Sequence, residues 1–230
     1  MLSALILFGW ALAVAQLAAA GDDADVKIIQ TVKPQFPLKL QQQGIVTGEA
    51  QLLIEVDASG RLADCLVTAF TQKEFAYESV RAVRAWRFVP ARIGGQPASA
   101  VAPLTVLFQF NGVVARVVHD VDRAPRRETR FEYQPCAARE LDAEPKLVLS
   151  VPPKFPAQLS EAGVTGKVTV DFFIDEAGKV RFPIAREPAE PRLAGLAIAA
   201  LKLWEFEPPK RGDLAVLARA STSFAFEPPP

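Results

Sequence analysis

The sequence has few of the residues from which metal centres and catalytic sites are built. It contains one His and two Cys in 230 residues, and these cannot complete a four-ligand zinc site made of Cys and His alone. His119 has no Ser, Cys or carboxylate partner at a spacing typical of a catalytic site. We therefore predict that the protein is not an enzyme and uses no metal and no small-molecule cofactor.

An excess of charge of one sign is also lacking, because 26 Lys and Arg residues are balanced by 26 Asp and Glu residues. A protein that binds nucleic acid needs a basic surplus to neutralise phosphates. The balance predicts no nucleic-acid partner, and a hydrophobic content of 50% is typical of a globular chain.

Only one long hydrophobic run is present, at residues 2–20. It carries no charge and ends in Ala18-Ala19-Ala20, directly before the polar residues Gly21-Asp22-Asp23. This pattern predicts a signal peptide over residues 1–20 that is cleaved to leave Gly21 as the first residue. The alternative is a retained membrane anchor, since about 20 apolar residues can span a bilayer. Under both interpretations the rest of the chain is exported.

The remainder of the chain contains an internal repeat. Four landmarks recur in the same order at an almost constant spacing, which predicts two homologous units joined by a linker at 111–146. We call residues 31–110 unit one and residues 147–226 unit two. The landmark pairs are Phe36-Pro37 and Phe155-Pro156, Asp57 to Gly60 and Asp175 to Gly178, Trp86 to Pro90 and Trp204 to Pro208, and Phe108 to Phe110 and Phe224 to Phe226.

Each unit has the same pattern of elements. A short helix (38–43 and 157–161) precedes a strand with strict alternation of apolar and polar residues, in which Ala50, Leu52 and Ile54 share one face. A turn containing Gly, a returning strand, an amphipathic helix and a last strand follow. The predicted fold class is α+β: two tandem domains, each a small antiparallel sheet with two helices on one face. Trp86, Phe88, Trp204 and Phe206 are predicted core residues.

This pattern resembles the TonB C-terminal domain family. The residues that carry the resemblance are Pro-x-Phe-Pro, Gly-x-x-Gly, the alternating strand, Asp-x-x-Gly and above all Trp86-Arg87-Phe88-Val89-Pro90, whose Trp, Phe and Pro return in unit two. The resemblance covers both units. It implies a location in the periplasm of Gram-negative bacteria and binding of a short peptide of an outer-membrane receptor or another envelope protein by β-strand addition. It also implies a part in TonB-dependent transport across the outer membrane.

The chain differs from a full-length energy transducer of that family. A transducer of the family type has a basic, uncleaved N-terminal anchor and a long Pro-rich spacer, whereas here residues 21–30 lead directly into unit one. Contact with inner-membrane motor proteins, which the resemblance also implies, is therefore left open.

The predicted peptide-binding element is the last strand of unit two, from Val216 to Phe226, because an edge strand offers unpaired backbone groups to an extended peptide. In unit one the linker is expected to occupy the same edge. Phe36 and Phe155 match the family segment that lies near the bound peptide; the alternative is that they are hydrophobic plugs. The predicted contact residues are Val216, Ala218, Ala220, Thr222, Phe224, Phe155 and Phe36.

The two cysteines, Cys65 and Cys136, are predicted to form a disulfide, since an exported chain with an even number of Cys can keep one. The alternative is two inert buried thiols.

Two hypotheses of function remain. The first is a periplasmic TonB-like module that binds a peptide by strand addition. The second is a structural scaffold of the cell envelope, in which the two units form a pseudo-dimer without energy transduction and bury their edges against each other. A free edge along the last strand distinguishes the first from the second.

Overall fold

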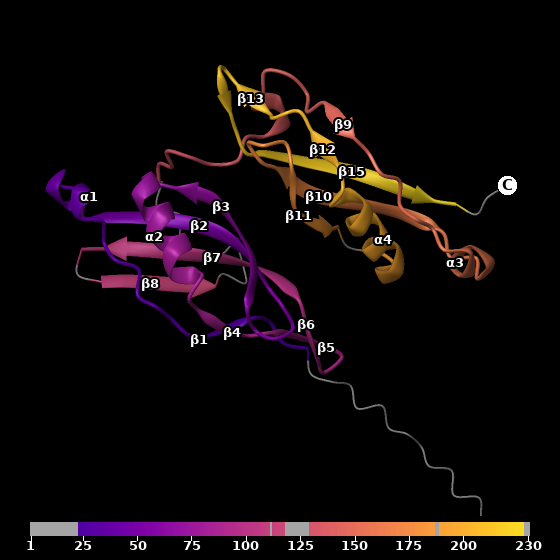
Figure 1. Ribbon diagram of the computed structural model, residues 1–230, viewed down its shortest axis with the longest axis horizontal. Helices are drawn as coiled ribbons and strands as arrows, with labels where there is room; N and C mark the ends of the chain where they lie inside the picture. Colours follow the sequence, from indigo (N-terminus) through magenta and orange to yellow (C-terminus); the bar gives the residue numbers. More distant parts are fainter. Residues whose placement is uncertain (1–22, 111, 118–128, 187–188, 228–230) are drawn as a thin grey trace, which may run out of the picture.

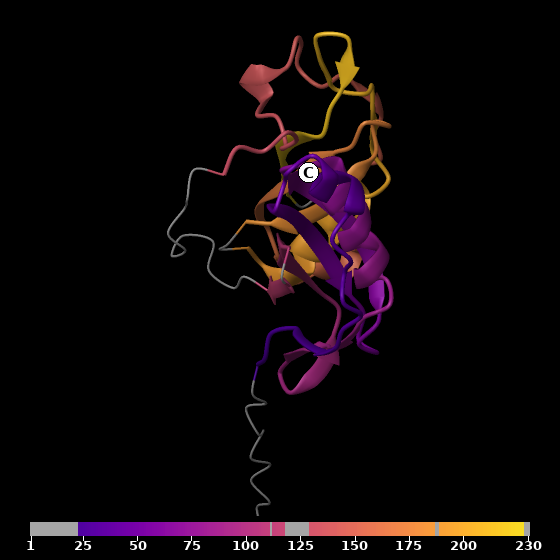
Figure 2. The ribbon, with the colours of Figure 1, turned by 90° about the vertical axis from the view of Figure 1, so that its left-hand side faces the viewer.

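The computed structural model describes residues 23–110, 112–117, 129–186 and 189–227, and Figure 1 shows them as two α+β units side by side. The predicted signal peptide lies outside the described residues. Within these ranges no helix is long and apolar enough to cross a membrane. Figure 2 shows the β13–β14 hairpin of unit two at one end of the molecule and the first described strand of unit one near the other.

Unit one is built on a four-stranded antiparallel sheet with the strand order β3-β2-β7-β8. Two further strand pairs, β1 with β4 and β5 with β6, lie beside it. The elements of this part of the chain are β1 (Lys27–Gln30), α1 (Leu38–Gln42), β2 (Thr47–Val56), β3 (Leu62–Phe70), α2 (Lys73–Val83), β4 (Arg87–Val89), β5 (Ala91–Ile93), β6 (Gln96–Ala98), β7 (Ala100–Gln109) and β8 (Gly112–Val117).

Unit two repeats this plan with a three-stranded antiparallel sheet, ordered β11-β10-β15. The small pairs are β9 with β12 and β13 with β14. After a short 3-10 helix in the linker (Ala138–Glu140), the elements are β9 (Leu147–Leu149), α3 (Ala157–Glu161), β10 (Gly166–Ile174), β11 (Val180–Ala185), α4 (Pro191–Leu201), β12 (Glu205–Phe206), β13 (Lys210–Arg211), β14 (Leu214–Ala215) and β15 (Ala218–Phe226).

The predicted alternation in the first long strand is confirmed. The apolar side chains of β2, from Ala50 to Val56, are buried, and they pack with α2 and Trp86 in one core. The matching residues of β10 form the core of unit two with α4. In each unit the indole Nε1–H of the corresponding Trp donates a hydrogen bond to a backbone carbonyl, from Trp86 to Val32 and from Trp204 to Val151, both at 2.8 Å.

The predicted turns at Gly60 and Gly178 are the most closely matched parts of the two units. Both glycines have a positive φ, of 78° and 80°. A Cβ atom at either position would lie 2.2 Å or 2.0 Å from the carbonyl oxygen of Phe88 or Phe206. Each turn therefore requires Gly both for its backbone conformation and for the close approach of another chain segment.

The register of the sheets corrects one landmark of the sequence repeat. Gly48 pairs with Phe108, and its counterpart Gly166 pairs with Phe226. Residue numbers differ by 118 for the two glycines and again by 118 for the two phenylalanines. Phe108 thus corresponds to Phe226 and not to Phe224, because the Phe-x-Phe spacing occurs in both strands with a shift of two residues.

The two units pack against each other through side chains of their sheets that point away from the helices. Leu66, Phe182 and Leu217 are buried together, and Leu53, Val101, Tyr133 and Phe173 pack around them. Phe182 lies at a β-bulge of β11 and has a φ of 49°, in the left-handed region. A bulge of this kind re-aims a side chain, and here it directs Phe182 to the contact with unit one.

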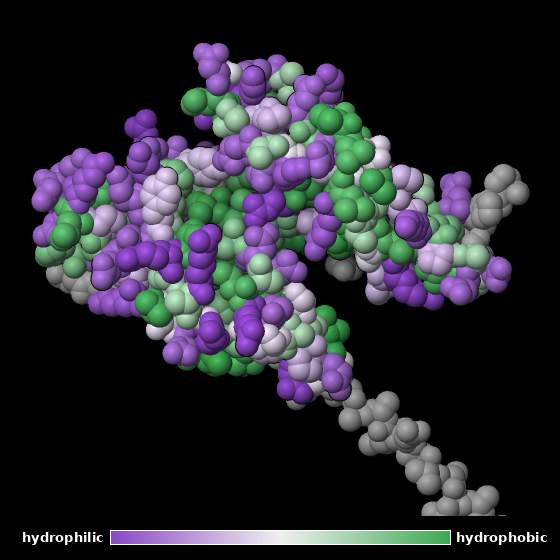
Figure 3. Space-filling model, in the orientation of Figure 1, coloured by the Kyte–Doolittle hydropathy of each residue, from purple (hydrophilic) through white to green (hydrophobic). Residues whose placement is uncertain are grey.

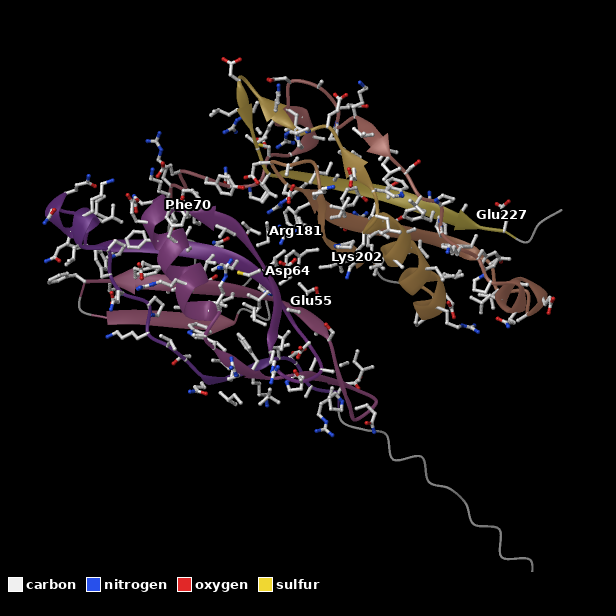
Figure 4. The ribbon with its side chains drawn as sticks, viewed as in Figure 1. Glu55, Asp64, Phe70, Arg181, Lys202 and Glu227 are labelled. Atoms are coloured by element: carbon white, nitrogen blue, oxygen red, sulfur yellow. The ribbon has the colours of Figure 1, made fainter. Side chains whose placement is uncertain are left out.

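An ion pair and the linker complete this contact. Figure 4 shows Arg181 and Asp64 pointing toward one another between the units, and their nearest N–O distance is 2.7 Å. Arg181 also contacts Asp175 at 3.5 Å. Tyr133 of the linker stacks on Phe70, with ring centroids 4.9 Å apart, and its hydroxyl donates to the carboxylate of Glu176.

The two units do not contact each other through a symmetric, two-fold interface. In an isologous pair, corresponding residues are buried to the same extent on both sides. Leu66 is 7% exposed, but its counterpart Ile184 is 47% exposed. Leu217 is fully buried, while its counterpart Ser99 is exposed.

Candidate functional site

The last strand of unit two, β15, has one side that no described strand pairs with over most of its length. It is the terminal strand of the order β11-β10-β15, and its pairing with β10 is regular over nine residues, from Ala218 to Phe226. A long, regular edge of this kind is a template for another strand.

The linker shows which backbone groups of β15 point outward. Cys136 donates its N–H to the carbonyl of Leu217 at 2.8 Å and accepts from the N–H of Arg219 at 2.9 Å. In a strand, the N–H and C=O groups of alternate residues point to opposite sides. The backbone groups of Ser221, Ser223 and Ala225 therefore point to the open side, beyond the single rung that Cys136 occupies.

The register shows where the predicted contact residues of β15 lie. The predicted residues Ala218, Ala220, Thr222 and Phe224 are half-buried or buried, and their backbone groups face β10. Val216 precedes β15 and donates its N–H to Pro209. The alternation of the sequence identifies the buried side chains, but the side on which the backbone is free depends on the pairing with β10 and Cys136, which no local pattern contains.

Other edges of the two sheets are irregular. The ladder between β2 and β3 shifts its register twice, and Tyr133 pairs with the end of β3 at Phe70. Strand β11 contains the bulge at Phe182 and also Pro183, which has no N–H to donate. Bulges and Pro protect an edge from further pairing, so β15 is the best acceptor of an added strand.

The corresponding edge of unit one is closed. Strand β8 pairs antiparallel with β7 from Leu104–Val117 to Gln109–Gly112. The expectation that the linker covers this edge is confirmed, because β8 is the first part of the linker. Among the described strands, the outer side of the last strand is therefore paired in unit one and unpaired over most of its length in unit two.

An apolar segment passes beside the end of β15. The ring of Phe155 lies 5.6 Å from that of Phe226, and the ring of Trp204 lies 5.4 Å from that of Phe224. The segment that carries Phe155 begins at β9, whose side chains Leu147, Val148 and Leu149 are exposed. Figure 3 shows a hydrophobic area over the upper part of unit two, where β9 lies. Phe36 packs on Phe75 and Phe110 and so lies against the core of unit one.

A comparison with protein families identifies the family of both units. The family described as Gram-negative bacterial TonB protein C-terminal matches residues 32–110 and again residues 151–228. The chain belongs to the TonB C-terminal family. It is also similar to the solution NMR structure of the Pseudomonas aeruginosa TonB C-terminal domain, at 23% identity, over 45% of this chain and 94% of that chain, with a TM-score of 0.28. No curated protein was found to match the chain.

The protein is accordingly a TonB-like envelope protein with two tandem TonB C-terminal units. This family is one of interaction domains, and the described residues contain no group of three His, Cys, Asp or Glu side chains that could hold a metal ion. His119 lies outside the described residues.

The predicted disulfide is not formed, since Cys65 and Cys136 are both free thiols. Cys65 is held in β3 opposite Ile54, and the backbone of Cys136 is fixed to β15 of the other unit. Burial, with a smaller contribution from the charge of Asp64, raises the pKa of the Cys65 thiol to about 11. Cys65 is therefore protonated and unreactive at neutral pH, as the alternative of inert thiols predicts.

Proposed function

We propose that the protein binds an extended peptide segment of an outer-membrane receptor or another envelope protein by adding it as a strand to β15. The observation that supports this most directly is the regular, nine-residue edge of β15, with Ser221, Ser223 and Ala225 directing their backbone groups outward. Strand addition uses main-chain hydrogen bonds for affinity and side-chain contacts on alternate positions for specificity.

Two surfaces flank a strand added at this edge. On the face away from the helix lie the exposed, mostly polar side chains of Arg219, Ser221 and Ser223. On the other face lie Phe155 and the half-buried Trp204. A peptide with polar and apolar residues in alternation matches these two surfaces.

The scaffold hypothesis predicts that the units bury their edges against each other. The contact between the units instead uses sheet faces and one rung at Cys136, and no described strand pairs with the outer side of β15 from Ser221 to Phe226. This favours peptide binding by unit two, in a TonB-like role at the envelope.

The test is capture from envelope extracts with three forms of the protein that begin at Gly21: the natural sequence, Ser223→Pro and Ser223→Ala. Pro removes the outward N–H at the centre of the edge, whereas Ala changes only the side chain. We expect an envelope protein that the natural form and S223A retain and that S223P loses. Circular dichroism establishes that S223P is folded; retention of the same partner by folded S223P would refute strand addition at this edge.

A further inference from the structure

The end of unit one at which the described chain begins carries an exposed surface of aliphatic and basic side chains. Here β1 pairs with β4, and Phe88 of this two-stranded ribbon is buried in the core of the unit. Figure 1 shows the ribbon and the β5–β6 hairpin together at the lower end of unit one. The exposed side chains of the ribbon are Lys27, Ile29, Arg87 and Val89.

The tip of the β5–β6 hairpin continues this surface. It presents Ile93, which is 64% exposed, and Arg92, whose guanidinium donates to the backbone carbonyl of Gly95. In Figure 3, hydrophobic and hydrophilic residues lie side by side at this end of unit one. None of the ion pairs within the described ranges includes Lys27, Arg87 or Arg92. The positive charge of this surface is therefore not compensated by an ion pair there.

The equivalent ribbon of unit two has balanced charges. It consists of β9 and β12, and its pairing places Glu205 and Glu207 where unit one has Arg87 and Val89. Both glutamates form ion pairs with lysines of unit two. Because both ribbons pair in the same way, the fold does not require the basic and aliphatic side chains of unit one. These side chains are available for a partner.

The chain that precedes unit one is fixed to the same surface. The carboxylate of Asp23 accepts a hydrogen bond from the N–H of Gly94 at the hairpin tip, at 2.7 Å, and Ala24 exchanges two backbone hydrogen bonds with Arg92. The apolar run at residues 2–20 ends three residues before Asp23, and three residues span at most about 11 Å. The surface therefore lies close to any bilayer that the apolar run enters.

We propose that the ribbon and hairpin tip of unit one bind the surface of a bilayer that contains anionic phospholipid. Lys and Arg side chains are attracted to anionic headgroups, and aliphatic side chains enter the boundary between headgroups and acyl chains. The site lies in unit one and does not depend on strand addition at β15 in unit two. A retained apolar run holds the surface at the membrane, whereas a chain that begins at Gly21 binds through the surface alone.

The form that begins at Gly21 is therefore the one to test, by co-sedimentation with lipid vesicles. We expect it to bind vesicles of phosphatidylcholine and phosphatidylglycerol and not vesicles of phosphatidylcholine alone. Binding should weaken as the salt concentration rises, because the charges are exposed. Failure to bind the anionic vesicles at low salt would overturn the proposal, and so would equal binding to both kinds of vesicle.

Charge reversal at equivalent ends of the two units locates the bound surface. Lys27→Glu with Arg87→Glu should weaken binding by at least about tenfold, since each basic residue near an anionic surface contributes about fivefold. The matched control is Lys210→Glu with Arg211→Glu, which changes the net charge equally at the exposed β13–β14 hairpin of the other unit. The control should change binding by less than about twofold, because this hairpin lies beyond the range of screened charges. Equal losses in the two variants, both folded by circular dichroism, would contradict the proposed surface.

A second pair of variants tests the aliphatic contact. Ile93→Ser should weaken vesicle binding by about threefold or more, because less apolar area enters the bilayer. Leu214→Ser is the control, since Leu214 is 71% exposed in the equivalent hairpin of unit two, and it should have no effect. Unchanged binding of I93S would contradict insertion of the hairpin tip. Binding to heparin without binding to anionic vesicles would assign the surface to an acidic polymer and refute lipid as its partner.

Discussion

The last strands of the two units have the same pairing with their neighbours but different edges. Strand β7 is paired with β8, which is the next segment of the chain, while no described strand pairs with the outer side of β15 beyond Cys136. The sequence of each unit contains the same family signature. Membership of the family therefore does not decide whether the outer side of a unit's last strand is paired, since in unit one the segment after that strand, β8, pairs with it.

The cores of the two units differ in how deeply they bury their aromatic side chains. Trp86 and Phe88 of unit one are buried, with Trp86 fully so, whereas Trp204 and Phe206 of unit two are half-buried. Val26, which precedes β1, is buried in the core of unit one. Unit one therefore buries these aromatic side chains more completely than unit two does.

Substitution of the two tryptophans tests this difference, and we expect the largest effect here. Trp86→Ala should lower the free energy of unfolding by about 3–5 kcal/mol, as is typical for a fully buried aromatic side chain. Trp204→Ala should cost roughly half as much, because part of its surface is already exposed. Urea unfolding followed by circular dichroism measures both values. Equal losses would mean that the two cores are packed equally well.

Leu217 and its counterpart Ser99 test whether the units depend on each other. Leu217 is fully buried against Leu66 and Phe182 of the contact between the units. Leu217→Ala should cost about 2–3 kcal/mol, near the low end for Leu in a core because two units can move together to close part of the cavity. Ser99→Ala should change stability by less than about 0.5 kcal/mol, as expected for a surface position.

Limited proteolysis of the linker shows whether Leu217 stabilises the contact between the units or only the core of unit two. If Leu217 stabilises the contact, Leu217→Ala should also speed cleavage near Tyr133, which packs beside it. A loss of stability without faster cleavage would assign Leu217 to the core of unit two alone.

The repeat, the alternation of β2 and β10 and the positions of the helices could be predicted from the sequence because they depend on local periodicity and turn residues. The register of the last strand could not. Phe-x-Phe occurs in both copies, so the sequence alone aligned Phe108 with Phe224, and only pairing with Gly48 and Gly166 reveals the shift of two.

The direction of the backbone groups along β15 could not be predicted from the sequence. The apolar residues of β15 mark the buried face, yet the outward backbone groups belong to the alternate residues, Ser221, Ser223 and Ala225. The contact between the units could not be predicted from the sequence either, because it depends on a bulge at Phe182 and on an ion pair between residues far apart in the sequence. The cysteine count suggested a bridge, whereas the two thiols are held by different strands.

Loss of the ion pair between the units should reduce the free energy of unfolding less than substitution of the tryptophans or of Leu217. The guanidinium of Arg181 donates to both carboxylate oxygens of Asp64, at 2.7 and 2.9 Å. Burial lowers the pKa of Arg181, but the hydrogen bond and charge of Asp64, with Asp175, outweigh this and raise it. Arg181 therefore stays charged throughout the accessible pH range.

A double-mutant cycle with Arg181→Met and Asp64→Asn measures the coupling between the two side chains. Asp64 is 42% exposed, so solvent screens the pair and we expect about 1 kcal/mol, the upper end for partly exposed pairs. The matched control is Lys146 with Glu207, an exposed pair within unit two at 2.6 Å, for which the cycle should give a value close to zero. The coupling of Arg181 and Asp64 should also fall with added salt. If it is as small as that of the control, the units are held together by their apolar contact and the linker, and the ion pair only selects their orientation.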